Sequence, residues 1–194
     1  MISDICKQTR TFRRFDASFK VEDDVLQSLV NLGRLAGSAR NVQPWQYILV
    51  NDQDNCNAVF PHLRWAGYLA DWAGPEKGEE PTGYILCILN KNWWKGSMKE
   101  AWFDLGIASQ NMLMGASELG FGGCRIASFT KELASLFPLE EYHSLELVIA
   151  LGKPVEKVKM VDGLPAGNVK YWRDGDDVHH VPKRVLEDIV LSFR

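Results

Sequence analysis

The longest helical pattern in the sequence sets the strongest constraint on the fold. Between Ser97 and Leu119 apolar residues recur near a 3.6-residue period, and they cover most of the helix circumference rather than one stripe. Small residues such as Ala108, Gly115 and Ala116 fall in the same stretch and allow a neighbouring element to approach closely. We therefore expect a central, largely buried helix, ended by the glycine-rich stretch that follows it.

Shorter helical and strand patterns alternate along the rest of the chain. The predicted elements are helices over 21–36, 55–63 and 185–193, and strands over 46–50, 84–89 and 145–151. Residues 66–82, which hold several glycines and prolines, are expected to form an irregular surface excursion. Interleaved helices and strands without a repeat or a linker predict an α+β fold, a mixed sheet packed with helices, as a single domain over 1–194.

Composition excludes several classes of protein. Apolar residues make up 46% and charged residues 24% of the chain, as in globular proteins. A net charge of −3 argues against a nucleic-acid partner, and no apolar window has the roughly 18 residues of a membrane span. The N-terminus lacks the apolar core of a secretory signal. Four cysteines and four histidines are scattered without metal-ligand spacing, so we expect reduced thiols, a cytoplasmic location and no metal site.

A cationic segment lies near the N-terminus. Arg10, Arg13 and Arg14 alternate with Thr11 and two phenylalanines directly before the first long helix. Guanidinium groups and a hydroxyl suit a phosphate, because the guanidinium fork matches two phosphate oxygens. The alternative is a solvated basic turn whose phenylalanines anchor it to the core.

A second candidate is the loop 37–45, between a predicted helix and a predicted strand. Its small residues let the backbone approach a flat ligand, and Ser38, Asn41 and Gln43 offer hydroxyl and amide partners. A planar heteroaromatic ring would suit such a loop. The alternative is a polar turn in which Pro44 and Trp45 plug the start of the strand.

Two further stretches offer weaker signals. Residues 120–129 are rich in glycine but lack the dinucleotide and P-loop patterns, so they either line a pocket or simply end a helix. Lys183 and Arg184 precede the predicted C-terminal helix, whose first amides also favour a phosphate. The alternative for this pair is two exposed cations. No protein nucleophile or paired-carboxylate motif emerges, which favours a cofactor that carries the chemistry.

Taken in order, these segments resemble the flavin-dependent nitroreductase family, and most of all its short bacterial members. The motifs are Arg-Thr-Phe-Arg-Arg-Phe at 10–15, Asn-Val-Gln-Pro-Trp at 41–45, Asp-Leu-Gly-Ile-Ala-Ser-Gln-Asn-Met-Leu at 104–113, Leu-Gly-Phe-Gly-Gly-Cys at 119–124 and Leu-Gly-Lys-Pro at 151–154. Each motif is weak alone, but five in the same order along nearly the whole chain are a strong combination.

The resemblance implies a central mixed sheet flanked by helices, in a homodimer with exchanged terminal segments and one flavin mononucleotide (FMN) at each end of the interface. It implies ping-pong hydride transfer from NAD(P)H to flavin N5, then to a small-molecule acceptor such as a nitroaromatic or a quinone, with no catalytic side chain. The implied FMN-binding residues are Arg10, Thr11 and Arg13 at the phosphate and ribityl chain, Ser38, Ala39 and Asn41 beside the ring, Ile126, Ala127 and Ser128 at the N5 edge, and Lys183 and Arg184 at the phosphate.

Three positions depart from the family pattern. Thr9 stands where many members have an arginine, Gly37 where proline is common and Arg40 where a small residue is usual. The loss of one phosphate arginine bears on FMN retention, for which Lys183 and Arg184 could compensate. The Arg40 side chain could reach the substrate mouth or cover the site.

Other functions stay open at this point. Within the same resemblance, reduced flavin could serve dehalogenation or the breakdown of flavin itself. A non-catalytic flavin-binding protein or an interaction module is also possible, since seven tryptophans could form a partner surface. The excursion around Trp65, Tyr68, Leu69 and Trp72 is expected to shape the substrate mouth.

Overall fold

The structure, a computed structural model, describes residues 1–163 and 168–191. Two compact units make up the chain: one comprises residues 1–65 and 74–155, the other residues 66–73 and 156–194. We refer to them as the main unit and the C-terminal unit and describe each by itself. No helix in the described part of the chain is both long and apolar enough to cross a membrane.

A four-stranded antiparallel sheet forms the centre of the main unit, with strand order β1-β2-β4-β3. The strands are β1 (Trp45–Val50), β2 (Gly83–Asn90), β3 (Gly122–Ile126) and β4 (His143–Gly152). Every residue of β2 is buried, as expected for a continuous apolar run between two neighbouring strands. The outer strands β1 and β3 form the two edges of the sheet, and this separates the segments that border them.

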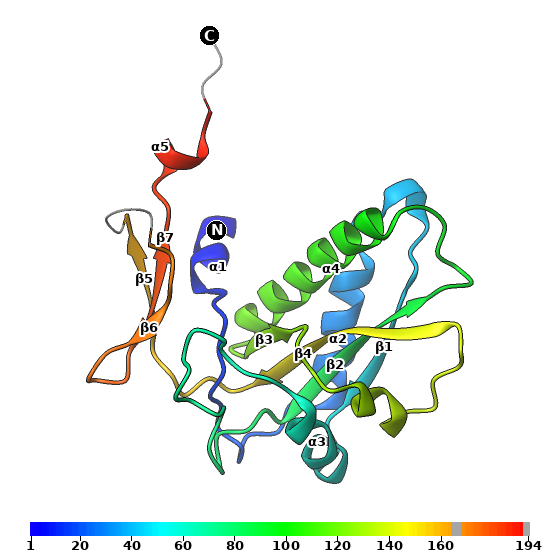
Figure 1. Ribbon diagram of the computed structural model, residues 1–194, viewed down its shortest axis with the longest axis horizontal. Helices are drawn as coiled ribbons and strands as arrows, with labels where there is room; N and C mark the ends of the chain where they lie inside the picture. Colours follow the sequence, from blue (N-terminus) through cyan, green and yellow to red (C-terminus); the bar gives the residue numbers. More distant parts are fainter. Residues whose placement is uncertain (164–167, 192–194) are drawn as a thin grey trace. The chain divides into compact units, whose positions relative to one another are not determined.

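Helices cover both faces of this sheet. On one face α2 (Asp23–Arg34) packs beside α4 (Met98–Glu118), and the core here includes Leu29, Met112 and Ile85 (Figure 1). The opposite face is covered by three short elements, α3 (Gln53–Val59), η2 (Phe60–His62) and η3 (Lys131–Leu136). A short N-terminal helix, α1 (Ile2–Gln8), and the turn η1 (Ala39–Asn41) complete the main unit.

Helix α4 and the strands β1, β2 and β4 lie where the apolar patterns of the sequence predicted a central helix and three strands, so these predictions are confirmed. Helix α4 begins after Ser97, whose hydroxyl accepts a hydrogen bond from the Glu100 N–H, while the Glu100 carboxylate accepts one from the Ser97 N–H. The predicted helix over 55–63 begins two residues earlier, because the Asp52 carboxylate caps α3, and its last part is the 3₁₀ turn η2, which contains Pro61.

The C-terminal unit holds a three-stranded sheet of order β5-β7-β6, formed by β5 (Val158–Asp162), β6 (Trp172–Arg173) and β7 (His179–Lys183). Residues 66–73 belong to this unit. The Tyr68 and Tyr171 ring centroids are 5.0 Å apart, and the Arg173 guanidinium lies 4.3 Å from the Trp72 ring centroid. Arg173 also forms an ion pair of 3.0 Å with the buried carboxylate of Glu156.

The predicted C-terminal helix over 185–193 is wrong in length. Helix α5 spans only Leu186–Ile189, and Val190 already has extended backbone angles; residues 192 and 193 lie outside the described residues. The apolar side chains of α5 remain exposed, at 65% for Leu186 and 59% for Ile189. Helix nucleation is costly, so an apolar stripe without a packing surface within the described chain does not sustain further turns.

Candidate functional site

The loop between α2 and β1 is the most constrained part of the predicted site. Arg40, Asn41 and Gln43 have φ angles of 52°, 55° and 50°, in the left-handed region that favours glycine. Each such residue costs about 1–3 kcal/mol and persists only where its surroundings hold it in place. Three within four residues therefore require specific anchors from neighbouring elements.

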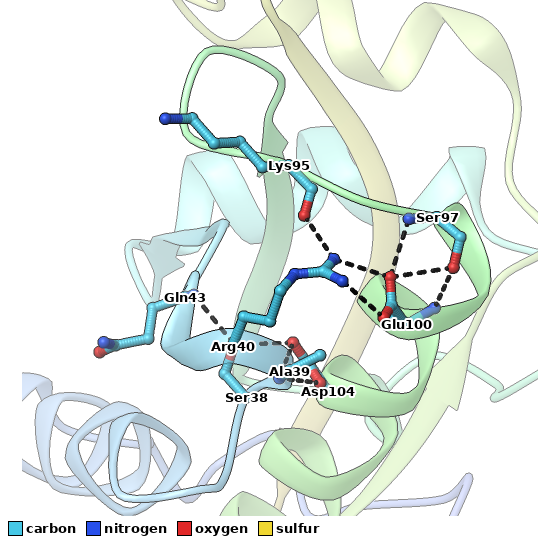
Figure 2. Close-up of polar contacts among 8 residues, drawn as sticks. All are labelled: Ser38, Ala39, Arg40, Gln43, Lys95, Ser97, Glu100 and Asp104. Carbon is cyan, nitrogen blue, oxygen red and sulfur yellow. Dashed lines mark hydrogen bonds and ion pairs between the residues drawn. The ribbon is translucent and has the colours of Figure 1, made fainter.

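The first anchor is Asp104, a buried carboxylate on α4. The Ser38 hydroxyl donates to its Oδ2 at 2.7 Å, and the Ala39 N–H donates to its Oδ1 at 3.0 Å (Figure 2). The Gln43 N–H in turn donates to the Ser38 oxygen at 2.9 Å. One side chain on a rigid helix thus fixes two of the residues predicted to lie beside the flavin ring.

The second anchor is Glu100, one helical turn before Asp104. The Arg40 guanidinium donates from Nη1 to Oε1 at 3.1 Å and from Nη2 to Oε2 at 2.9 Å, and Nη2 also donates to the Lys95 carbonyl at 2.9 Å (Figure 2). Hydrogen bonds from the Ser97 backbone N–H, and then from Arg40, lower the pKa of the Glu100 carboxyl. The Arg40 side chain is thus directed to the start of α4.

A cavity of about 380 Å³ lies beneath this loop. Its lining combines aromatic rings with a few polar groups, the composition typical of a site for a planar ligand. Burial raises the pKa of the Tyr47 hydroxyl in this lining, which keeps the phenol neutral. The lining residues are Gly33, Arg34, Ala36, Gly37, Ser38, Val42, Gln43, Trp45, Tyr47, Trp93, Asp104 and Ala108.

The cationic segment lies along the outer edge of β3. Thr11 forms a parallel bridge with Gly123, and the Phe12 N–H donates to the Gly123 carbonyl at 3.1 Å. Arg10 is partly buried: its Nη2 donates to the Cys6 carbonyl at 2.6 Å, and desolvation lowers its pKa. The predicted phosphate-binding residues Arg10, Thr11 and Arg13 therefore follow one edge of the sheet.

Arg14 has a structural role instead. Its guanidinium forms two hydrogen bonds of 2.6 Å with the Glu79 carboxylate, and both side chains are about three-quarters buried. A bidentate pair of this kind fixes the segment around residue 79 against the N-terminal segment.

The predicted N5-edge segment continues from β3. Ile126 is the buried last residue of the strand, whereas Ala127 and Ser128 are exposed. The Ser128 carbonyl accepts a hydrogen bond of 3.0 Å from the Arg64 N–H, and Leu63 bridges Phe129. The backbone after β3 is therefore tied to residues 63–64.

Within one chain the main unit brings some of the predicted residues together and keeps others apart. Residues 10–13 and 126–128 share the β3 edge, whereas residues 38–41 lead into β1 at the other edge, about 14 Å away across the sheet. The same loop packs on the first turns of α4, at Asp104, whereas β3 follows the last turn of α4. The two ends of this helix are about 20 Å apart.

The remaining two predicted residues belong to the C-terminal unit. Lys183 is the exposed last residue of β7 and Arg184 follows it, also exposed. Their place at the phosphate stays a prediction, as does the role of Tyr68 and Trp72 at a substrate mouth. Among the described residues there is no group of three or more His, Cys, Asp or Glu side chains arranged to hold a metal ion.

Sequence reasoning missed Glu100 and Asp104. The Ser-x-x-Glu capping pattern at 97–100 could have identified the first, because it places Glu100 at the exposed start of a helix. The second could have been found as a lone acid among small and apolar residues of the central helix, a position where a carboxylate needs hydrogen-bond donors.

Comparison with known proteins identifies relatives along most of the chain. A family model described as "Nitroreductase family" matches residues 6–73 and 80–153. A Bacillus subtilis (strain 168) protein named "Putative NAD(P)H nitroreductase YodC" is 21% identical over 196 residues, covering 87% of this chain and 97% of that protein.

Two solved structures show the same fold. A Desulfovibrio desulfuricans protein, described as "a putative nitroreductase in complex with fmn", aligns at a TM-score of 0.65 with 25% identity over 80% of this chain and 87% of its own. The Vibrio harveyi NADPH:FMN oxidoreductase complexed with NAD⁺ aligns at 0.64 with 20% identity, over 84% of this chain and 73% of its own.

Proposed function

This chain belongs to the nitroreductase family and is an oxidoreductase, and from this premise we propose that it is an FMN-dependent enzyme that takes hydride from NAD(P)H. The FMN-bound Desulfovibrio desulfuricans relative and the name of the Bacillus subtilis relative support this assignment. We propose that the enzyme works by ping-pong exchange, with a nitroaromatic, a quinone or a similar small molecule as the acceptor. The single domain over 1–194 belongs to the same proposal.

The chemistry of the residues fits FMN. Arg10 and Arg13 are cations and Thr11 is an exposed hydroxyl, a donor set that suits a phosphate. The anchored loop beside an aromatic-lined cavity suits a planar ring. When bound, FMN supplies the redox chemistry: it accepts a hydride from the nicotinamide and passes electrons to the acceptor.

The chain's own residues bind and orient in this proposal. Arg10, Thr11 and Arg13 hold the phosphate and ribityl chain, and Lys183 and Arg184 close the phosphate site. Ser38, Ala39 and Asn41 lie beside the ring. The backbone of Ile126, Ala127 and Ser128 borders its N5 edge. Asp104 and Glu100 act as positioning residues, since their carboxylates hold the loop through Ser38, Ala39 and Arg40.

We propose a homodimer as the functional unit. Within one chain the loop 38–41 and the segment 10–13 border opposite edges of the sheet, so one ligand can contact both only if a second chain contributes one of them. Helix α4 offers a surface for this contact: Trp102, Phe103 and Ile107 are 41%, 58% and 48% exposed. Burial of such apolar side chains stabilises a protein interface.

The anchored loop beside the aromatic-lined cavity is the observation that carries the flavin assignment, and visible absorption spectroscopy tests that assignment. We expect the purified chain with added FMN to show a bound flavin spectrum that bleaches on anaerobic addition of NADH or NADPH. Bound flavin that neither nucleotide reduces would contradict the enzyme assignment and favour a flavin-binding protein. Reduction without turnover of nitro compounds or quinones would restrict the error to the acceptor.

The double substitution Arg10→Ala with Arg13→Ala tests the phosphate site. Loss of two charge-assisted contacts, each worth about 1.5–3 kcal/mol, should weaken FMN binding by at least about 100-fold. The matched control is Lys91→Ala with Lys131→Ala, which removes two exposed cations elsewhere in the main unit. Full flavin occupancy in the arginine variant, measured by absorbance after gel filtration, would refute the assignment of these two residues.

A further inference from the structure

A short pairing of two chain segments follows β3 along the chain. Residues 62–64 run antiparallel to residues 128–130, with a bridge between Leu63 and Phe129. Backbone hydrogen bonds of 3.0 Å and 2.9 Å flank this bridge, one from residue 64 to residue 128 and one from residue 130 to residue 62. Both segments lie in the main unit, and the pairing fixes which of their side chains lie next to one another.

The two faces of this pairing differ in chemistry. Leu63 is 3% exposed, and Phe129 packs against the same core cluster. In an extended backbone successive side chains point to opposite sides, so the neighbours of these two residues share the other face, which we call the polar face. Its residues are the half-buried His62 and Thr130 and the exposed Arg64 and Ser128.

One half of the polar face is engaged in its own hydrogen bonds. The His62 Nδ1 lies 2.7 Å from the Thr130 hydroxyl oxygen. The pKa of the Glu132 carboxyl is lowered by hydrogen bonds from its own backbone N–H and from the Thr130 hydroxyl. Because this hydroxyl has a single proton, its oxygen accepts the bond from the His62 Nδ1–H. This half of the face therefore has a carboxylate of its own and little affinity for a second anion.

Arg64, in the other half of the polar face, is a cation without a carboxylate. Its Nη1 donates to the Pro61 and Leu63 carbonyls, both at 3.3 Å. No acidic side chain in the described part of the chain forms an ion pair with it, whereas Arg14 and Arg40 each bind a glutamate. Its Nε and Nη2 make no hydrogen bond to the described residues. Such a planar fork matches both oxygens of a carboxylate.

The polar face adjoins the segment 126–128, whose backbone borders flavin N5 in the proposed function. The core fills the opposite face of the pairing, so a ligand reaches this backbone from the polar face. Paired segments lie about 5 Å apart, and Arg64 is the direct neighbour of Ser128. An acceptor at the N5 edge therefore lies beside an exposed guanidinium.

We propose that Arg64 selects acceptors that carry a carboxylate, an inference that rests on the proposed flavin-dependent function. The Nε and Nη2 groups of Arg64 bind the two carboxylate oxygens, and the exposed Ser128 hydroxyl offers a further donor. Since a carboxylate on an aromatic ring lies at a fixed distance from the reducible group, the same contact orients the ring at N5. The acceptor class is thus an aromatic carboxylate with a nitro or quinone group.

Two nitro compounds of nearly the same shape test this selection in the full chain with excess FMN. 4-Nitrobenzoate carries a carboxylate, whereas 4-nitrobenzamide carries a neutral amide in its place. Backbone amide NMR without an electron donor follows the binding of each compound to the oxidised protein. We expect 4-nitrobenzoate to bind about 10-fold more tightly, the effect of one charge-assisted contact, with shifts concentrated on residues 62–64 and 128–130.

Three variants complete the test. Arg64→Ala removes the guanidinium and should lower the affinity for 4-nitrobenzoate to that for 4-nitrobenzamide. This variant should fold, because the side chain is exposed and binds only carbonyls of its own segment. Arg64→Lys keeps the charge but not the planar fork, so it should restore part of the difference. Lys91→Ala, the matched control, removes an exposed cation elsewhere in the main unit and should keep the whole difference.

Four results would overturn the proposal: equal affinity of the unmodified chain for the two compounds; a difference that persists in Arg64→Ala; equal weakening of both compounds by that substitution, as expected if Arg64 only supports the fold; or shifts concentrated on residues 10–13, as expected if the carboxylate occupies the phosphate site. None of these depends on electron transfer. Failure of this proposal is therefore distinguishable from failure of the flavin assignment, which the absorption experiment measures separately.

Discussion

At the scale of single residues, Asp104 has the largest expected effect on the candidate site. Asp104→Ala leaves the Ser38 hydroxyl and the Ala39 N–H without their acceptor, which should lower the free energy of unfolding by about 1–3 kcal/mol and weaken FMN binding. Asp104→Asn keeps one acceptor oxygen and should recover part of both losses. Urea unfolding and flavin titration measure the two effects.

Glu118→Ala is the control for this pair, because Glu118 is an exposed acid at the other end of the same helix. Its effect on unfolding should stay within about 0.5 kcal/mol. If Asp104→Ala were equally neutral in both measurements, the loop would not depend on this carboxylate.

The second prediction at this scale concerns pH and Glu100. The pKa of the Glu100 carboxyl is lowered from its ordinary 4.5 in the folded state. A lowered folded pKa stabilises the protein above the unfolded pKa, and the stabilisation is lost as pH falls through the folded pKa. Glu100→Gln should therefore unfold at a lower temperature than the unmodified chain at neutral pH, and the difference should vanish in acid.

Thermal unfolding of both proteins across the acid range measures this difference. The pair with Arg40 is exposed, so the effect should be small and should shrink in high salt. A difference that persists unchanged in acid would mean that Glu100 acts through its shape rather than its charge.

At the scale of elements, Gly123 controls the pairing of β3 with β4. A Cβ at this position would lie 2.7 Å from the Ala150 carbonyl oxygen and 2.7 Å from Leu113 Cδ2, and a backbone atom cannot turn aside as a flexible side chain can. Gly123→Ala should lower the free energy of unfolding by about 1–3 kcal/mol, the usual cost of overpacking, and should displace the segment that bridges Thr11.

Gly67→Ala is the matched control, since a Cβ there meets nothing within 4 Å. Chemical denaturation of both variants measures the contrast. Comparable stability of the two would show that β3 can shift from β4 at little cost, and would remove the link between the sheet edge and the cationic segment.

The helices and strands differ in how well they could be predicted from the sequence. The long central helix and the strands β1, β2 and β4 could be predicted because their apolar patterns are long and uninterrupted. Strand β3 could not: two of its five residues are glycines, and β4 rather than its own composition holds it in place. The short strands β5 to β7 were missed as well, since β6 has only two residues and β5 pairs with β7 in parallel across the intervening segment.

For the candidate site, the sequence predicted the loop 37–45 and the cationic segment, but it did not predict Asp104 and Glu100, which hold the loop in place. The left-handed angles at Arg40, Asn41 and Gln43 depend on acids some 60 residues later, a contact that no local pattern encodes. The aromatic residues of the loop cavity likewise come from separate elements, β1 and the segment before α4.

At the scale of the whole molecule, the proposed homodimer makes the sharpest prediction. Phe103→Asp with Ile107→Asp places two charges on the exposed apolar face of α4, where burial in an interface would leave them unpaired. The monomer fold should persist, because both side chains point away from the core. We expect analytical ultracentrifugation to show a monomer, and flavin titration to show loss of FMN binding, because each FMN would lack the residues of the second chain.

Leu136→Asp provides the control, since Leu136 is 45% exposed on η3, on the other face of the sheet. It should remain dimeric and bind FMN. A double variant that becomes monomeric yet retains full flavin would show that one chain assembles the whole site, so that the separation of the loop 38–41 from the segment 10–13 must be closed by movement within the chain. If the double variant loses both the dimer and FMN binding, the result supports a site in which the loop 38–41 of one chain and the segment 10–13 of the other bind the same FMN.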